Sequence, residues 1–67
     1  MIDIELNGAA FQIAAGSSLQ QLIAALALEN QALALAVNRQ VVRRERWPAQ
    51  QLQAGDKVDV VRAIGGG

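Results

Sequence analysis

The dipeptide Asn7-Gly8 constrains the fold of this chain more than any other short segment. It lies between residues 2–6 and residues 11–13, in which apolar and polar side chains alternate. Asn-Gly is preferred at the centre of a two-residue hairpin turn, because both turn positions need a positive φ angle. Alternation with a period of two is typical of a strand with one buried face. The sequence therefore predicts an N-terminal β-hairpin.

An amphipathic helix is predicted after the hairpin. Ser18 lies three residues before Gln21, which is the spacing of a capping box at a helix N-terminus. Large aliphatic residues then follow at intervals of three and four, on one helical face: Leu19, Leu22, Ile23 and Leu26. Residues 29–31 are polar and do not continue this face, so we expect the helix to end near Leu28.

The second half of the chain contains two clear strand patterns. Residues 33–37 alternate leucine or valine with alanine, and residues 57–64 alternate again after a turn at Gly55-Asp56. A short strand is expected at residues 40–42. Residues 43–48 indicate an irregular or single-turn segment, since the proline that closes it disfavours helical geometry in the preceding residue.

The predicted order of elements, β-β-α-β-β-β, favours an α+β fold. One helix would cover one face of a mixed sheet of four to five strands, with the first and last strands side by side and parallel. This is the β-grasp, or ubiquitin-like, architecture. We expect it to occupy residues 1–64, and residues 65–67 to form a flexible Gly-Gly-Gly tail.

The composition excludes several kinds of chemistry. A chain of 67 residues makes one domain and buries only about 60% of its unfolded surface, so a deep active site is not expected. The sequence has no cysteine and no histidine, which leaves no disulfide, thiol nucleophile or imidazole base, and no metal site is expected. Six basic and six acidic residues cancel, so we expect no nucleic-acid partner.

Membrane association is not expected either. The longest uninterrupted apolar run, residues 22–28, is far shorter than the roughly 20 residues of a membrane-spanning helix. The N-terminus lacks the basic start of a signal peptide. We therefore expect a cytoplasmic protein without a membrane partner.

Two polar groups are candidates for a catalytic or binding site. Asp3 and Glu5 share a strand face, but no second catalytic group accompanies them, so we interpret them as solvated charges. The three arginines of residues 43–46, followed by Trp47, resemble a nucleic-acid contact in which cations meet phosphates and an aromatic ring stacks on a base. Because the cluster is short and contains Glu45, we favour a solvated loop held by a half-buried tryptophan.

The glycines after Ile64 offer different chemistry. No side chain stands beside the carboxylate of Gly67, and Gly65 and Gly66 allow the backbone to lie in a channel too narrow for a Cβ atom. Three residues extend roughly 10 Å, far enough to reach another protein's active site. The alternative is an idle, disordered terminus.

Several stretches resemble a known family at matching positions along the whole chain. They are Ile4-Glu5-Leu6-Asn7-Gly8, Ser18-Leu19-Gln20-Gln21-Leu22, Ala36-Val37-Asn38, Val41-Val42 with Arg44, Gly55-Asp56-Lys57-Val58 and Ile64-Gly65-Gly66-Gly67. Together they resemble the sulfur carriers of thiamine biosynthesis, the ThiS family, which have a ubiquitin-like fold. One departure is Arg43, where that family often has proline. The related small subunit of molybdopterin synthase is the runner-up.

The resemblance implies a carrier rather than an enzyme, with no bound cofactor. The carboxylate of Gly67 would be adenylated with ATP by an E1-like adenylyltransferase. Sulfur from a cysteine desulfurase would convert it to a thiocarboxylate, and thiazole synthase would accept the sulfur. Two rival hypotheses are a ubiquitin-like binding module with an idle tail and a ubiquitin-like modifier of other proteins.

A partner-binding surface is also expected on the sheet. Small apolar residues point outward from the two strands near the tail: Ala34, Ala36, Val61 and Ala63. Arg62 and Ile64 are expected to flank them. The alternative is that a small sheet leaves some alanine exposed without any partner.

Overall fold

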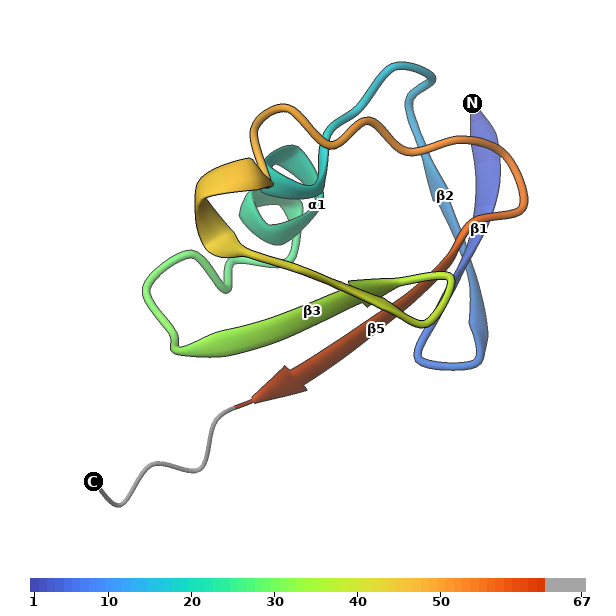
Figure 1. The fold of residues 1–67 in the computed structure, drawn as a ribbon. Helices are drawn as coiled ribbons and strands as arrows, with labels where there is room; N and C mark the ends of the chain where they lie inside the picture. The colour runs from blue at the N-terminus through green and yellow to red at the C-terminus, as the bar shows by residue number, and fades with distance from the viewer. Residues whose placement is uncertain (63–67) are drawn as a thin grey trace.

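The computed structural model describes residues 1–62 as five strands, one α-helix and one 3₁₀ turn (Figure 1). The elements are β1 (Ile2–Leu6), β2 (Ala9–Ile13), α1 (Leu19–Ala25), β3 (Leu33–Val37), β4 (Gln40–Val42), η1 (Arg44–Arg46) and β5 (Lys57–Arg62). The predictions for residues 63–67, including the glycine tail, lie outside the described residues. No helix within residues 1–62 is long and apolar enough to cross a membrane.

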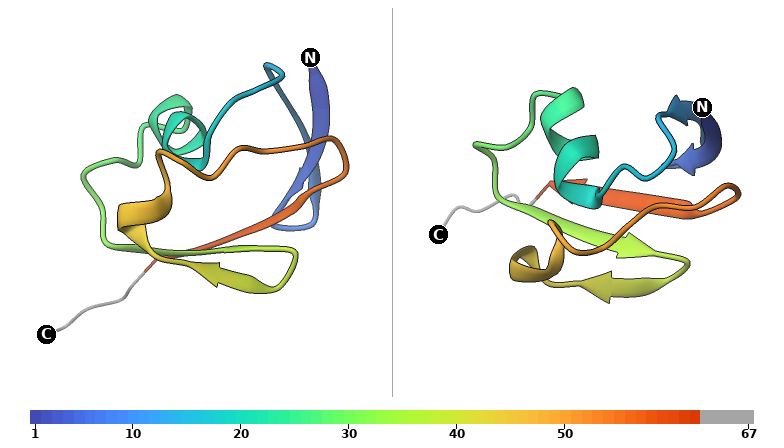
Figure 2. Two further views of the ribbon diagram at one scale, coloured as in Figure 1. Left: turned by 45° about the horizontal axis from the view of Figure 1, so that its top comes forward. Right: turned by 90° about the horizontal axis from the view of Figure 1, so that it is seen from above.

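The sheet is mixed and has the strand order β2-β1-β5-β3-β4. β1 and β5 are parallel, while β1 pairs with β2, β3 with β4, and β3 with β5 in antiparallel register. Helix α1 lies on one face of this sheet (Figure 2). The predicted α+β architecture and the parallel pairing of the first and last strands are confirmed.

Both hairpins turn through two residues with positive φ angles. Asn7 and Gly8 have φ angles of 49° and 83° between β1 and β2. Asn38 and Arg39 have φ angles of 51° and 70° between β3 and β4. Two adjacent positive values define a type I′ turn, whose twist matches that of the flanking strands. The predicted turn at Asn7-Gly8 is therefore confirmed, and the turn at Asn38 and Arg39 leads into the short strand expected at residues 40–42, although Arg39 lacks the conformational freedom of glycine.

Helix α1 begins where the sequence predicts but ends earlier. The Ser18 hydroxyl oxygen accepts a hydrogen bond from the Gln21 backbone N–H (3.2 Å), and the Gln21 side-chain oxygen accepts one from the Ser18 N–H (2.8 Å). At the other end, Ala27 has a φ angle of 58°. Its N–H donates to the Ala24 carbonyl (3.0 Å), and the Leu28 N–H donates to the Ile23 carbonyl (3.0 Å). These two bonds form a Schellman motif, which stops the helix before Leu28.

The core lies between α1 and the sheet and is mainly aliphatic. Its buried members are Ile4, Ile13, Leu19, Leu22, Ile23, Leu35, Val37, Trp47, Leu52 and Val58. The prediction of a half-buried Trp47 is wrong, because only 1% of this side chain is exposed. Its indole N–H donates to the Val42 carbonyl (2.9 Å), which satisfies the polar end of the ring inside the core. Leu52, in the segment after η1, is a core residue that the periodicity did not reveal.

Candidate functional site

Strand β5 occupies the centre of the sheet and leads to the predicted tail. β1 lies along one edge of it and β3 along the other. The predicted modified residue Gly67 and the threading residues Gly65 and Gly66 lie outside the described residues, as do Ala63 and Ile64. The structure describes the chain as far as Arg62, and we call the end of β5 at this residue the base of the tail.

Two asparagine side chains hold β5 in place. At its start, the Lys57 N–H donates to the Asn38 side-chain oxygen (3.0 Å), and the Asn38 N–H donates to the Lys57 carbonyl (2.7 Å). On the opposite edge, the Asn7 N–H donates to the Val58 carbonyl (2.9 Å), and the Asn7 side-chain oxygen accepts from the Val60 N–H (2.8 Å). Both turn residues thus bond to β5, which gives the base of the tail a fixed direction.

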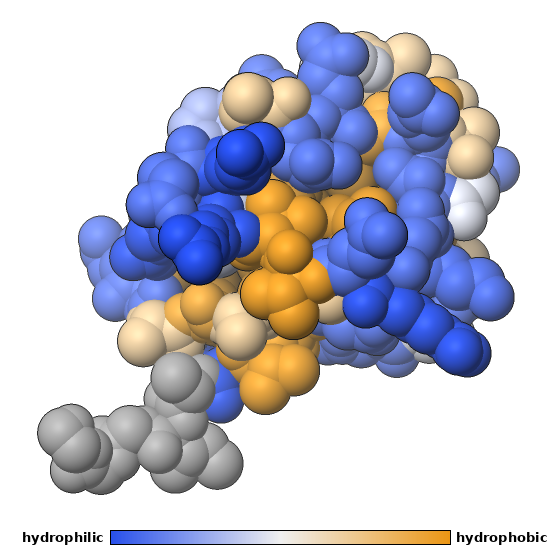
Figure 3. Space-filling model, in the orientation of Figure 1, coloured by the Kyte–Doolittle hydropathy of each residue, from blue (hydrophilic) through white to orange (hydrophobic). Residues whose placement is uncertain are grey.

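Three of the residues predicted for the partner surface lie together on the outer face of the sheet, and a fourth residue that was not predicted joins them. Ala34 lies opposite Val61, and Val61 is 60% exposed. Ala36 lies opposite Val41, which is 79% exposed and was missed because β4 is too short to show a clear alternation. We call Ala34, Ala36, Val41 and Val61 the apolar sheet patch. Figure 3 shows apolar surface that extends to the last described residues.

Arg62 faces away from this patch. It pairs with Leu33, which shares its side of the sheet with the buried Leu35, while the outward residues of β5 are Asp59 and Val61. Neighbouring residues of a strand point to opposite faces, so Arg62 projects toward the helix side. Arg62 was predicted to flank the patch; it lies next to Val61 along β5, but its side chain is on the opposite face of the sheet.

The other half of the outer face is charged. Asp3 and Glu5 are both exposed on β1, and Glu5 lies beside Lys57 of β5. The Asp3 carboxylate accepts a hydrogen bond from the Gln12 side chain (2.9 Å) on the neighbouring strand. Both carboxylates are on exposed strand residues, as predicted from the sequence.

The three arginines around η1 have different environments. The Arg44 guanidinium lies 4.9 Å from the centre of the Trp47 ring and donates to the backbone carbonyls of Gln31 (3.1 Å) and Glu29 (3.5 Å). Arg43 and Arg46 instead line an open cleft. Since Trp47 is in the core, its ring is not available to stack on a base, which removes the basis for the nucleic-acid interpretation.

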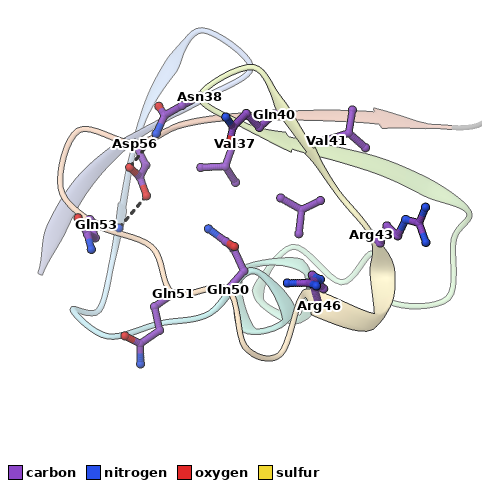
Figure 4. Close-up of a pocket in the computed structure, with 11 residues that line it drawn as sticks. Val37, Asn38, Gln40, Val41, Arg43, Arg46, Gln50, Gln51, Gln53 and Asp56 are labelled. Atoms are coloured by element: carbon purple, nitrogen blue, oxygen red, sulfur yellow. Dashed lines mark hydrogen bonds between the residues drawn. The ribbon is translucent and has the colours of Figure 1, made fainter.

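The cleft lies between the β3–β4 hairpin and residues 50–53 and has a volume of about 510 Å³ (Figure 4). Asp56 at one end accepts hydrogen bonds from the Asn38 side chain (3.2 Å) and from the Gln53 backbone N–H (2.9 Å). Most of the remaining lining is glutamine, valine and arginine. This set contains no paired nucleophile and base. Within residues 1–62 there is also no group of three metal-binding side chains.

A mixed five-stranded sheet with one covering helix, whose central strand leads to a Gly-Gly-Gly sequence, is the arrangement of a ubiquitin-like β-grasp carrier. The sequence model of the ThiS family matches residues 4–67. The chain belongs to the ThiS family.

Its relatives agree with this assignment. The chain is 36% identical to the sulfur carrier protein ThiS of Escherichia coli over 66 residues, covering 98% of this chain and all of that protein. The crystal structure of the thiamine biosynthesis protein ThiS from Geobacter metallireducens superposes with a TM-score of 0.85 at 25% identity, over 98% of this chain and all of that one. The solution structure of a thiamine biosynthesis protein from the same organism gives 0.78, over 98% of this chain and 88% of that one.

A longer protein also contains a similar segment. A thiazole synthase of Magnetococcus marinus is 38% identical over 64 residues, which cover 96% of this chain but only 20% of that enzyme. The ThiS resemblance predicted from the sequence is confirmed, in preference to the molybdopterin-synthase small subunit. The chain is a sulfur carrier protein of thiamine biosynthesis.

Proposed function

We propose that the chain carries sulfur as a thiocarboxylate on Gly67 and delivers it for thiazole formation. The observation that carries this proposal is the match to the ThiS family, which extends to residue 67 and includes all three glycines. The sequence also contains no cysteine, so sulfur cannot be held here as a thiol or persulfide. A C-terminal carboxylate is the remaining place for it.

The chemistry requires activation by a partner. A carboxylate is a poor electrophile, so one oxygen must first become part of a good leaving group. An E1-like adenylyltransferase would supply it by forming an acyl adenylate from ATP and the Gly67 carboxylate. The persulfide that a desulfurase forms from cysteine would then displace AMP to give an acyl persulfide. A thiol would cleave its S–S bond, which releases the thiocarboxylate and leaves the thiol oxidised in a disulfide. The chain itself would act as a cytoplasmic co-substrate of these enzymes, not as a catalyst.

The fold would contribute rigidity and a docking surface. The hydrogen bonds of Asn7 and Asn38 hold β5 on both edges, so Gly65 and Gly66 would extend from a fixed base. The apolar sheet patch lies beside that base and would contact the enzyme that receives the tail. A thiazole synthase with a segment similar to this chain supports thiazole synthase as one such partner.

Intact-mass measurement tests the proposal. Protein isolated from cells should contain a species heavier by about 16 Da, since sulfur replaces one oxygen. Deletion of Gly67, or addition of one residue after it, should abolish this species. Circular dichroism should show an unchanged fold in both variants, because the last described residues that pack in the core are Val58 and Val60. An extended protein that still gains sulfur without being processed would refute the assignment to Gly67.

A further inference from the structure

We propose that the free edge of β5 at Arg62 accepts an extended segment of the enzyme that holds the tail, so that this segment becomes an added strand of the sheet. This inference rests on the proposed function, because it concerns how the base of the tail is held while Gly67 reacts. The occupant is a strand of the partner enzyme and not a second copy of this chain.

The direction of the backbone groups follows from the hydrogen bonds of β5. The Val58 carbonyl and the Val60 N–H both bond to Asn7, so they point toward the β1 edge. Backbone groups of successive strand residues point to opposite edges. The backbone N–H and carbonyl groups of Asp59 and Val61 therefore point toward β3. Those of Arg62 point toward the same edge as those of Val58 and Val60.

That edge is open beyond Val60. β1 ends at Leu6, and the last register pair between β1 and β5 is Leu6 with Val58. The Val60 carbonyl and the Arg62 N–H have no ladder partner within residues 1–62. The equivalent pair two residues earlier, the Val58 carbonyl and the Val60 N–H, is bonded by Asn7.

A partner residue placed beside Val61 would bond to the Val60 carbonyl and the Arg62 N–H, as Asn7 bonds to the Val58 carbonyl and the Val60 N–H. In a parallel strand its N–H would donate to the Val60 carbonyl and its carbonyl would accept from the Arg62 N–H. In an antiparallel strand the Arg62 N–H would again be a donor. Strand addition of this kind derives its affinity from main-chain hydrogen bonds and is a common way of binding an extended segment.

Charge favours a partner enzyme over a second copy. Symmetric pairing of two copies around Arg62 would place two arginine side chains opposite each other, and like charges directly opposite destabilise a sheet. A partner strand with an acidic or neutral residue at that position avoids this cost. Val61, 60% exposed on the other face, would contact an apolar residue of the same strand.

Pairing at Arg62 would also align the residues that follow. In a strand ladder, one hydrogen-bonded pair fixes the register of the neighbouring residues. A pair at Arg62 would therefore fix the position of each following residue relative to the partner strand. A partner strand at this edge would therefore determine how far Gly67 reaches into an active site. The apolar sheet patch cannot set this distance as directly, because apolar side-chain contacts allow the two surfaces to shift relative to each other.

The test separates the backbone N–H of Arg62 from its side chain. Arg62→Pro removes the N–H, and Arg62→Ala keeps it while removing the charge; proline is tolerated on a strand edge where its missing N–H is not bonded in the free protein. Binding to purified thiazole synthase and to the activating enzyme is measured by calorimetry. We expect Arg62→Pro to weaken binding about tenfold or more, and Arg62→Ala by less than about threefold.

Amide hydrogen exchange of the unmutated chain provides a measurement that does not depend on folding of a variant. The Arg62 amide should exchange quickly in the free protein and slowly in the complex. Equal affinities for the two variants, or an Arg62 amide that exchanges equally fast in the complex, would overturn strand addition while leaving the carrier function intact. An unmutated chain without affinity for either enzyme would overturn both proposals.

Discussion

Replacement of Arg44 by alanine should destabilise the domain, although this side chain is exposed. Its guanidinium joins three parts of the molecule: η1, the Trp47 ring and the backbone carbonyls of Gln31 and Glu29. The latter two residues lie just before β3, whose first residue Leu33 pairs with Arg62. Arg44 thus fixes the segment that enters the sheet beside the base of the tail.

The magnitude can be estimated from these contacts. A cation over an aromatic face at an exposed site contributes about 0.5–1 kcal/mol. A hydrogen bond of a charged donor contributes roughly 1.5 kcal/mol at the lower end of its range, and the bond to Glu29 is too long to add much. The sum is about 2 kcal/mol, which for a domain of this size corresponds to a fall in Tm of roughly 8–16 °C. Arg44→Lys should lose about half of this, since an ammonium keeps the charge but not the planar fork.

Urea unfolding followed by the fluorescence of Trp47 provides the assay, because this tryptophan is buried in the folded state. Arg43→Ala and Arg46→Ala are matched controls from the same turn, and both should change stability by less than about 0.5 kcal/mol. If all three alanine variants unfold at the same urea concentration, the bonds of Arg44 to the 29–31 segment have no energetic importance and the estimate is refuted.

Two further substitutions test local features of the fold. Trp47→Phe removes the indole N–H bonded to Val42 and leaves a small cavity, and we expect a loss of about 2–3 kcal/mol in urea unfolding followed by circular dichroism; a loss below about 1 kcal/mol would show that the indole bond is unimportant. Ala27→Gly should raise stability by about 0.5–1 kcal/mol, because glycine adopts the positive φ angle of this position without strain; a lower Tm would contradict that account.

Local sequence signals were sufficient where a turn or cap is made by adjacent residues. The Asn7-Gly8 turn and the Ser18–Gln21 capping box are of this kind, and both were predicted at the observed positions. The end of α1 was predicted too late, near Leu28, because the left-handed position is occupied by Ala27 and not by the glycine that usually marks it. The burial of Trp47 depends on η1 folding back until the indole meets the Val42 carbonyl, which no local pattern indicates.

The candidate surface also combines features that local sequence predicts with features that depend on the assembled sheet. Alternation correctly placed Ala34, Ala36 and Val61 on the outer face, because a strand has a fixed period of two. Val41 joins them through the register of a hairpin, and the register depends on a turn in which Asn38 favours a positive φ angle but Arg39 does not. The open edge of β5 depends on where β1 ends relative to a strand about 50 residues away, which is a property of the assembled sheet.

The central position of β5 also determines the order in which the sheet can form. β1 pairs with β2 and β3 pairs with β4 over short sequence distances, but the two hairpins are joined through β5, the last strand along the described chain. Contacts between distant segments form slowly, because a long loop must close first. During synthesis on a ribosome, the two hairpins would therefore remain separate until residues 57–62 had emerged. A partly synthesised chain would therefore lack the completed outer face of the sheet.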